Sequence, residues 1–281
     1  MEITTQISLN SEKDPFIIKN LNGEIVFVKN YLLKQKEIRK TARIIKEKLT
    51  IIEKKFLQHL LIANPKNLIK EQYKETEETT REILEKEYLT NKLWITNNIP
   101  TPVIISITNT ELISDYVPSK TFHELIGKEY KPETLQEMIN LYQKIRMIAL
   151  EQNNPNILHT DPHPSNFIKS TKTGQVLALD SSFKLKQNKT TTEIDCLING
   201  LFALQLSRLN SKPEIYEAHA ELYLQSLGKD AKKIKLPRMN PASKTYFELR
   251  EKIAHKIMGR EYNSNEAVFK AYESLKKMIP N

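Results

Sequence analysis

The sequence predicts an α+β fold with a small β-rich N-terminal lobe, residues 1–117, and a larger, mainly helical C-terminal lobe, residues 118–281. Two observations support this prediction. Short apolar segments separated by turn-forming pairs dominate the strand-like part of the first lobe, whereas apolar residues recur at helical spacing through most of the second. We expect a hinge between the two patterns, near residues 115–118 and ending at Pro118.

The first lobe is expected to begin with strands. Residues 3–8 alternate weakly, and the segments FIIK and EIVFVK flank an Asn-Gly pair, which is typical of a hairpin with a tight turn. Residues 32–75 then have lysine-rich helical periodicity and are expected to form a helical insertion. A further helix is predicted over residues 76–96, and after Pro100 the segments VIISIT and ELISDYV predict another strand pair.

The second lobe is expected to be helical directly after Pro118 and again over most of its length. Six apolar residues mark one face of a predicted helix: Leu135, Met138, Ile139, Tyr142, Ile145 and Ala149. After this helix, a turn around Gly174 separates two predicted short strands, the second of which is VLALD. From Glu193 onward the pattern is helical, with proline breaks.

Composition limits the location and the partners of the protein. With 43 basic and 34 acidic residues the net charge is +9, which favours a nucleotide or an anionic lipid surface; nucleic acid is the least favoured anionic partner. Cys196 is the only cysteine, so no internal disulfide can form. The N-terminal residues lack a secretory pattern, and no apolar run approaches the ~20 residues that span a bilayer. We therefore expect a cytoplasmic protein that at most touches the membrane peripherally.

The segment ILHTDPHPSNFI, residues 157–168, is the richest in chemically active side chains. Three interpretations compete. His159, Asp161 and His163 alternate like metal ligands on one side of a strand, but prolines disfavour a regular strand and no other Cys or His is near in sequence. A structural turn would explain the prolines but not the polar residues. A catalytic loop would explain both.

The catalytic-loop interpretation rests on spacing. Asp161 and Asn166 are five positions apart and His159 precedes the aspartate by two, as in the kinase pattern H-R-D-x-x-x-x-N. A following apolar run leads to Asp180, as kinases present a metal-binding aspartate. A carboxylate can accept the proton of an acceptor hydroxyl, while an amide oxygen and a second carboxylate suit Mg²⁺.

These residues resemble those of protein-kinase-like phosphotransferases, and the resemblance covers most of the chain. The segment DPHPSNF is similar to the D-P-H-x-G-N-F loop of bacterial lipopolysaccharide core heptose kinases. It also resembles the H-x-D-P-H-P-G-N loop of atypical kinases linked to ubiquinone synthesis. The resemblance implies ATP and Mg²⁺ as cofactors, with Asp161 as base and Asn166 and Asp180 as metal ligands. It also implies an acceptor hydroxyl on a lipid-linked core sugar.

The resemblance implies further roles in the first lobe. Lys29, at the end of a predicted strand, would contact the α- and β-phosphates, and Glu87 on the following helix would anchor it, with Glu85 as a rival. Asp115 and Val117 would offer backbone groups to the adenine.

Three residues of the second lobe would support the site. His159 and His163 belong to the loop pattern, where His163 either fixes the backbone or meets the phosphate or acceptor. Asp195 corresponds to an aspartate that braces the catalytic loop from a following helix.

Two features depart from the kinase pattern. The first hundred residues contain a single glycine, Gly23, so no glycine-rich loop covers the phosphates; residues 9–14 would have to do so. The insertion over residues 32–75 would either pack on the first lobe or bind an anionic lipid. Other acceptors, a small molecule or a protein, remain open, as does a nucleotide-binding pseudokinase that acts as a scaffold.

Overall fold

The computed structural model describes seven parts of the chain: residues 16–21, 23–30, 77–126, 131–180, 190–207, 213–236 and 265–279. The predicted strand at residues 3–8, the segment 9–14 and the insertion 32–75 lie outside them. The described residues divide into two compact units. Residues 16–30, 77–86 and 104–116 belong to the first, and the other described residues belong to the second.

The first unit contains a four-stranded antiparallel sheet in the order β1-β2-β4-β3. The strands are β1 (Phe16–Leu21), β2 (Glu24–Asn30), β3 (Ile104–Ile107) and β4 (Glu111–Asp115). Both predicted strand pairs are confirmed. Gly23 has φ +90° between β1 and β2, a conformation that glycine adopts without strain, and its N–H donates to the Asn20 side chain at 2.9 Å.

The second unit contains a small antiparallel sheet, β5-β6-β7, and most of the helices. Its strands are β5 (Ser119–Thr121), β6 (Phe167–Ser170) and β7 (Val176–Ala178). The prediction of helix directly after Pro118 is wrong for three residues, because β5 pairs with β6. The Pro118 carbonyl also accepts hydrogen bonds from the N–H and hydroxyl of Thr171, at 2.8 and 3.0 Å. Partners this distant in the chain leave no local signal in the sequence.

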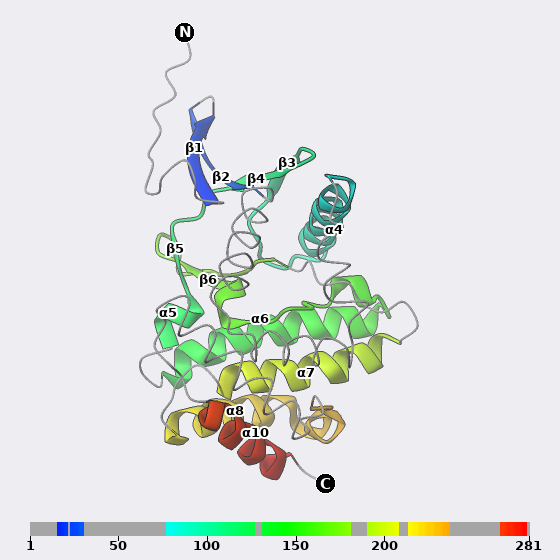
Figure 1. The fold of residues 1–281 in the computed structure, drawn as a ribbon, viewed down its shortest axis with the longest axis vertical. Coiled ribbons are helices and arrows are strands. Elements are labelled where there is room, and N and C mark those ends of the chain that lie inside the picture. Colours follow the sequence, from blue (N-terminus) through cyan, green and yellow to red (C-terminus); the bar gives the residue numbers. More distant parts are fainter. Residues whose placement is uncertain are drawn as a thin grey trace, which may run out of the picture. The chain divides into compact units, whose positions relative to one another are not determined.

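Helices cover most of the remaining described chain. They are α4 (Glu77–Thr96), α5 (Phe122–Ile126), α6 (Pro132–Glu151), α7 (Thr191–Ser207), α8 (Pro213–Leu227) and α10 (Asn265–Met278), with 3₁₀ turns η1 (Pro155–Ile157), η2 (Pro164–Asn166) and η3 (Gly228–Lys233). Figure 1 shows α6, α7, α8 and α10 packed together in the second unit. None of the described helices combines the length and apolar character needed to cross a membrane.

The core of the second unit forms around the apolar face of α6. All six residues predicted on that face are buried, so the helical periodicity identified them correctly. Four aromatic rings from four elements continue this core, with neighbouring centroids 4.3–6.1 Å apart: Tyr142, Phe167, Phe202 and Tyr223. Because Phe167 directly follows Asn166, the core holds the end of the predicted catalytic loop.

Gly200 lets the chain after η3 approach α7 closely. A Cβ added at Gly200 would lie 2.3 Å from the backbone oxygen of Lys235. The Lys235 N–H donates to the Cys196 carbonyl at 3.0 Å, so this backbone is attached to α7 at the same place. Glycine is therefore required by space rather than by its backbone angles.

We expect Gly200→Ala to lower the free energy of unfolding by about 1–3 kcal/mol, because the methyl group overlaps backbone that cannot rotate away. Helix propensity alone would give the opposite sign, a gain of about 1 kcal/mol. Urea denaturation measures the difference. Leu201→Ala on the same helix is the control, since Leu201 is exposed and should change the value by no more than about 0.5 kcal/mol. A stabilised Gly200→Ala protein would contradict the close approach.

Candidate functional site

The loop before β6 brings Asp161 and Asn166 together. The Asn166 side-chain amide donates to the backbone oxygen of Asp161 at 2.9 Å and to its carboxylate Oδ2 at 3.2 Å. Two backbone bonds of 2.7 Å close the turn, from His163 N–H to the Asp161 carbonyl and from Asn166 N–H to the His163 carbonyl. The Asp161 side chain is exposed, so it is accessible to a second molecule.

Strand pairing adds Asp180 to the same end of the sheet. Phe167 lies opposite Ala178 in the β6–β7 pair, and the Leu179 N–H donates to the Asn166 carbonyl at 2.8 Å. Asp180 follows immediately and has φ +46°, in the left-handed region that aspartate and asparagine tolerate better than most residues. Strained backbone of this kind often occurs at functional positions.

The geometry is compatible with a magnesium site. Because the Asn166 NH₂ group donates to Asp161, its amide oxygen is left for another ligand, and the half-buried Asp180 carboxylate follows the strand that pairs beside it. An amide oxygen, a carboxylate and several waters are a usual ligand set for Mg²⁺. Among the described residues there is no group of three or more His, Cys, Asp or Glu side chains that could hold a metal ion without other ligands.

His159 lies in the core behind the loop. Its ring is fully buried between Trp94 and Phe167, with centroids at 5.3 and 4.9 Å. Asp161, two residues later, is exposed, so the two side chains do not face a shared metal position. Burial lowers the pKa of His159 to about 4, although the nearby Asp180 charge and the backbone of Asn166 oppose this shift. His159 is therefore neutral at physiological pH and supports the loop by packing.

This buried imidazole should make the protein acid-sensitive. The unfolded state takes up a proton below pH 6.5, whereas folded His159 does so only near pH 4, so stability is lost as the pH falls through this window. We expect a contribution of up to about 3 kcal/mol to that loss. Urea denaturation at several pH values should show a shallower acid dependence for His159→Phe, a ring that cannot titrate. Equal slopes for both proteins would contradict the assignment.

His163 is half-buried and caps η2. Its Nδ1 accepts from the Ser165 N–H at 3.1 Å, which supports the predicted role of fixing backbone. Its ring also stacks on that of His123 from α5, with centroids 6.1 Å apart and planes inclined by 27°. His123 was not among the residues predicted for the site.

The phosphate-contact candidates lie in different units of the structure. Lys29 on β2 is 5% exposed and lies on the opposite face of the strand from Val26 and Val28. Glu87 on α4 is 8% exposed. Lysine and glutamate are seldom this buried without a partner, which favours a specific role for each. The rival Glu85 is exposed and pairs with Arg81 at 2.8 Å on the same helix.

The two residues predicted to meet adenine lie at the end of β4 and shortly after it. Asp115 is the last residue of β4, is exposed and pairs with Val26 across the sheet. Val117 is half-buried in the segment that leads to β5.

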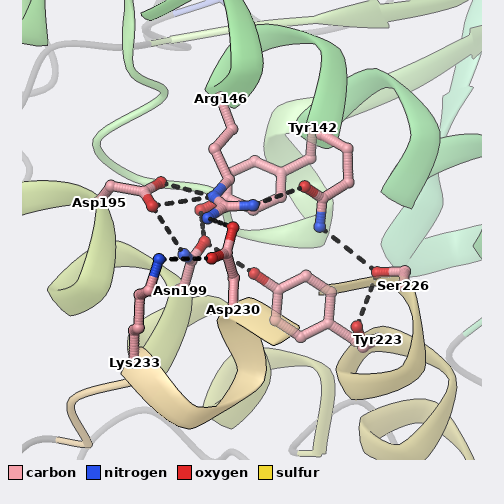
Figure 2. Close-up of polar contacts among 9 residues, drawn as sticks. Tyr142, Arg146, Asp195, Asn199, Tyr223, Ser226, Asp230 and Lys233 are labelled. Atoms are coloured by element: carbon pink, nitrogen blue, oxygen red, sulfur yellow. Dashed lines mark hydrogen bonds and ion pairs between the residues drawn. The ribbon is translucent and has the colours of Figure 1, made fainter. Parts of the chain in front are cut away.

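Asp195 takes partners that differ from those predicted. Both of its carboxylate oxygens accept from the Arg146 Nε, at 2.8 and 2.9 Å, and Oδ2 also accepts from the Asn199 amide at 3.1 Å (Figure 2). The hydrogen bonds of Asp195 among the described residues therefore join α6 and α7, and a direct brace to residues 157–167 is not among them.

Arg146 is the centre of this buried network. Its Nη2 donates to Asp230 of η3 at 2.7 Å, so one guanidinium binds two aspartates (Figure 2). Burial acts to lower the pKa of Arg146, but the two carboxylates outweigh it and raise the pKa. The Asn199 oxygen accepts from the hydroxyls of Tyr142 and Tyr223, both at 2.9 Å, so the polar atoms of this cluster are well satisfied.

Comparison with known proteins does not extend these observations. No protein-family model matches the chain, and no curated protein matches it at a significant level.

Proposed function

We propose that the protein is an ATP- and Mg²⁺-dependent phosphotransferase of the protein-kinase-like group, acting on a hydroxyl. The observation that carries the proposal is the meeting of Asp161, Asn166 and Asp180 at one end of the β6–β7 pair. Their order and spacing resemble the kinase catalytic loop and metal-binding aspartate. The close hydrogen bonding within the loop supports the view that these side chains act together.

Each residue has a distinct task in this proposal. Asp161 orients the acceptor hydroxyl and takes its proton. The Asn166 NH₂ group holds the Asp161 carboxylate in place, and the Asn166 amide oxygen would be the metal ligand. Asp180 supplies the charged metal ligand. Mg-ATP, when bound, supplies the phosphoryl group. The buried Lys29 is the proposed phosphate contact and Glu87 its anchor, while the backbone at Asp115 and Val117 meets the adenine.

By resemblance, the acceptor is a sugar of a lipopolysaccharide core. The enzyme would then work in the cytoplasm and touch the inner face of the membrane only peripherally. The net charge of +9 supports an anionic acceptor surface. A small molecule or a protein with a hydroxyl group is an alternative acceptor for the same catalytic residues.

A pseudokinase is the second candidate, and a specific observation favours it. Gly23 is the only glycine in the first hundred residues, and it lies at a hairpin tip, so a glycine-rich phosphate loop is missing from that part of the sequence. The exposed carboxylate of Asp161 counts against this candidate, because a scaffold does not need a group that faces an acceptor.

The affinity for nucleotide should depend on Mg²⁺. We expect ATP to raise the melting temperature clearly only when Mg²⁺ is present, because Asn166 and Asp180 act through the metal. Asp180→Ala should remove the Mg²⁺-dependent part of the shift. Glu221→Ala, an exposed acid on α8, is a matched control and should retain it. A shift that is the same with and without Mg²⁺, or that survives Asp180→Ala, would contradict the metal assignment.

A further inference from the structure

The end of α4 is attached to the residues that enter the loop bearing Asp161. Although α4 begins in the first unit, residues 87–103 belong to the second unit, together with the loop. Trp94, in the last turn of α4, is 2% exposed, and its indole N–H donates to the Ile157 carbonyl at 2.7 Å. Its ring also contacts that of His159, with centroids 5.3 Å apart. One side chain therefore holds the chain at two points shortly before Asp161.

The way in which α4 ends fixes this tryptophan. Asn98 has φ +54°, and its N–H donates to the Ile95 carbonyl at 3.0 Å. The Ile99 N–H donates to the Trp94 carbonyl at 2.8 Å, which completes a Schellman motif. Such a motif is usually accompanied by an apolar contact across the turn, and both Trp94 and Ile99 are buried in the core of the second unit. The Lys144 ammonium of α6 also donates to the Asn98 carbonyl, so the end of α4 is attached to α6.

The backbone that follows α4 is attached to the strand that leads to Asp180. The Pro100 carbonyl accepts from the N–H of Ala178, the last residue of β7, at 2.9 Å. This bond joins main-chain atoms only, so a change of the Trp94 side chain should leave it in place. The influence of Trp94 on Asp161 can therefore be separated from the support of the metal side of the site.

We propose that Trp94 is a positioning residue for phosphoryl transfer, which acts on Asp161 through the backbone of residues 157–160. This inference rests on the proposed function. A base must lie within hydrogen-bond distance of the acceptor hydroxyl, and a displacement of about 1 Å can slow a reaction about 100-fold. The indole N–H fixes the backbone that enters the loop, while the buried Phe167 fixes the backbone that leaves it. Trp94 sets the place of the Asp161 carboxylate and has no part in the chemical step.

The indole N–H distinguishes this role from simple core packing. Because Trp94 is the only tryptophan, an analogue supplied in place of tryptophan enters the chain at this position alone. Benzothienylalanine, in which sulfur replaces the ring NH, keeps the shape of the indole and its contact with His159 but cannot donate to Ile157. Trp94→Phe makes the same test with a smaller ring.

We expect both changes to lower ATP turnover about tenfold while Mg-ATP affinity stays near that of the wild type. Affinity should be retained because the bond from the Leu179 N–H to the Asn166 carbonyl does not involve the indole. Hydrogen–deuterium exchange should become faster within residues 157–166 and stay unchanged in α8. Normal turnover and normal loop exchange with the analogue would overturn the proposal, as would an equal loss of turnover and Mg-ATP affinity.

Tyr223→Phe is the matched control, because it also removes one buried aromatic donor from the second unit. The Tyr223 hydroxyl of α8 donates to the Asn199 side chain of α7 at 2.9 Å. Turnover and loop exchange should stay at the wild-type values in this variant. If turnover falls as far as in Trp94→Phe, the loss of any buried hydrogen bond slows the enzyme, and a specific role for Trp94 is overturned.

Exchange and turnover together distinguish this inference from the proposed function. ATP turnover that is the same in the wild type and in both Trp94 variants would overturn the role of Trp94 and leave phosphotransfer intact. If the wild-type protein neither binds Mg-ATP nor consumes ATP, phosphotransfer is wrong. Faster loop exchange in the Trp94 variants would then still support Trp94 as the residue that positions Asp161.

Discussion

Asp161→Asn is expected to lower turnover by about 10²–10⁴-fold while Mg-ATP affinity stays near that of the wild type. The change keeps the shape of the side chain and removes its charge, so the acceptor proton loses its base. The Asn166 amide still has the Asp161 backbone oxygen as a partner at 2.9 Å, so the proposed metal ligand keeps its orientation. ATP consumption, with water or a lipid-linked sugar as acceptor, measures the loss.

Asp180→Asn is the matched comparison, because asparagine also tolerates the φ of +46° at this position. It removes a charged metal ligand, so nucleotide affinity should fall together with turnover. If Asp161→Asn keeps full turnover, residues 157–168 are not a catalytic loop. If both variants lose only affinity, Asp161 and Asp180 share one role and the division of tasks proposed here is wrong.

Removing the Arg146 side chain is expected to produce the largest loss of stability among the described residues that we propose to change. Arg146→Ala leaves Asp195, which is 2% exposed, without its cation, and breaking a buried ion pair in this way costs about 3–5 kcal/mol. The loss arises from an uncompensated buried charge, in addition to the missing hydrogen bonds. Urea denaturation should show a lower midpoint with an unchanged m value.

Two comparisons make this result specific. Arg81→Ala removes an arginine whose partner Glu85 is exposed, so the free energy of unfolding should change by no more than about 0.5 kcal/mol. Arg146→Met combined with Asp195→Leu removes both charges and should recover much of the loss seen with Arg146→Ala. A loss below about 1 kcal/mol for Arg146→Ala would show that the buried network is not a principal source of stability.

The parts of the fold that follow from local periodicity could be predicted. The apolar positions of α6, the hairpin around Gly23 and the strands before and after Asn109 each depend on residues close in sequence. The order of Asp161, Asn166 and Asp180 also predicted that they would meet, because two short strands joined by a turn return the chain to its starting point.

Other features could not be predicted because their partners lie far apart in the chain. Asp230 is indistinguishable from any surface acid until η3 brings it to Arg146, 84 residues away. His123 occupies the first turn of a five-residue helix, and its proximity to His163 depends on how α5 and η2 pack. Asp195 was identified as important from its position in the sequence, but the guanidinium that binds it was not.

The surroundings of Trp94 give the protein a built-in optical reporter. Trp94 is the only tryptophan in the chain, its indole N–H donates to the Ile157 carbonyl at 2.7 Å, and its ring touches His159. The indole therefore lies against the residues that enter the loop bearing Asp161. Intrinsic fluorescence excited at the tryptophan band follows this one location without a label, and a protonated neighbouring imidazole quenches it. Displacement of the loop, whether by ligand, acid or denaturant, consequently changes the emission of a single chromophore.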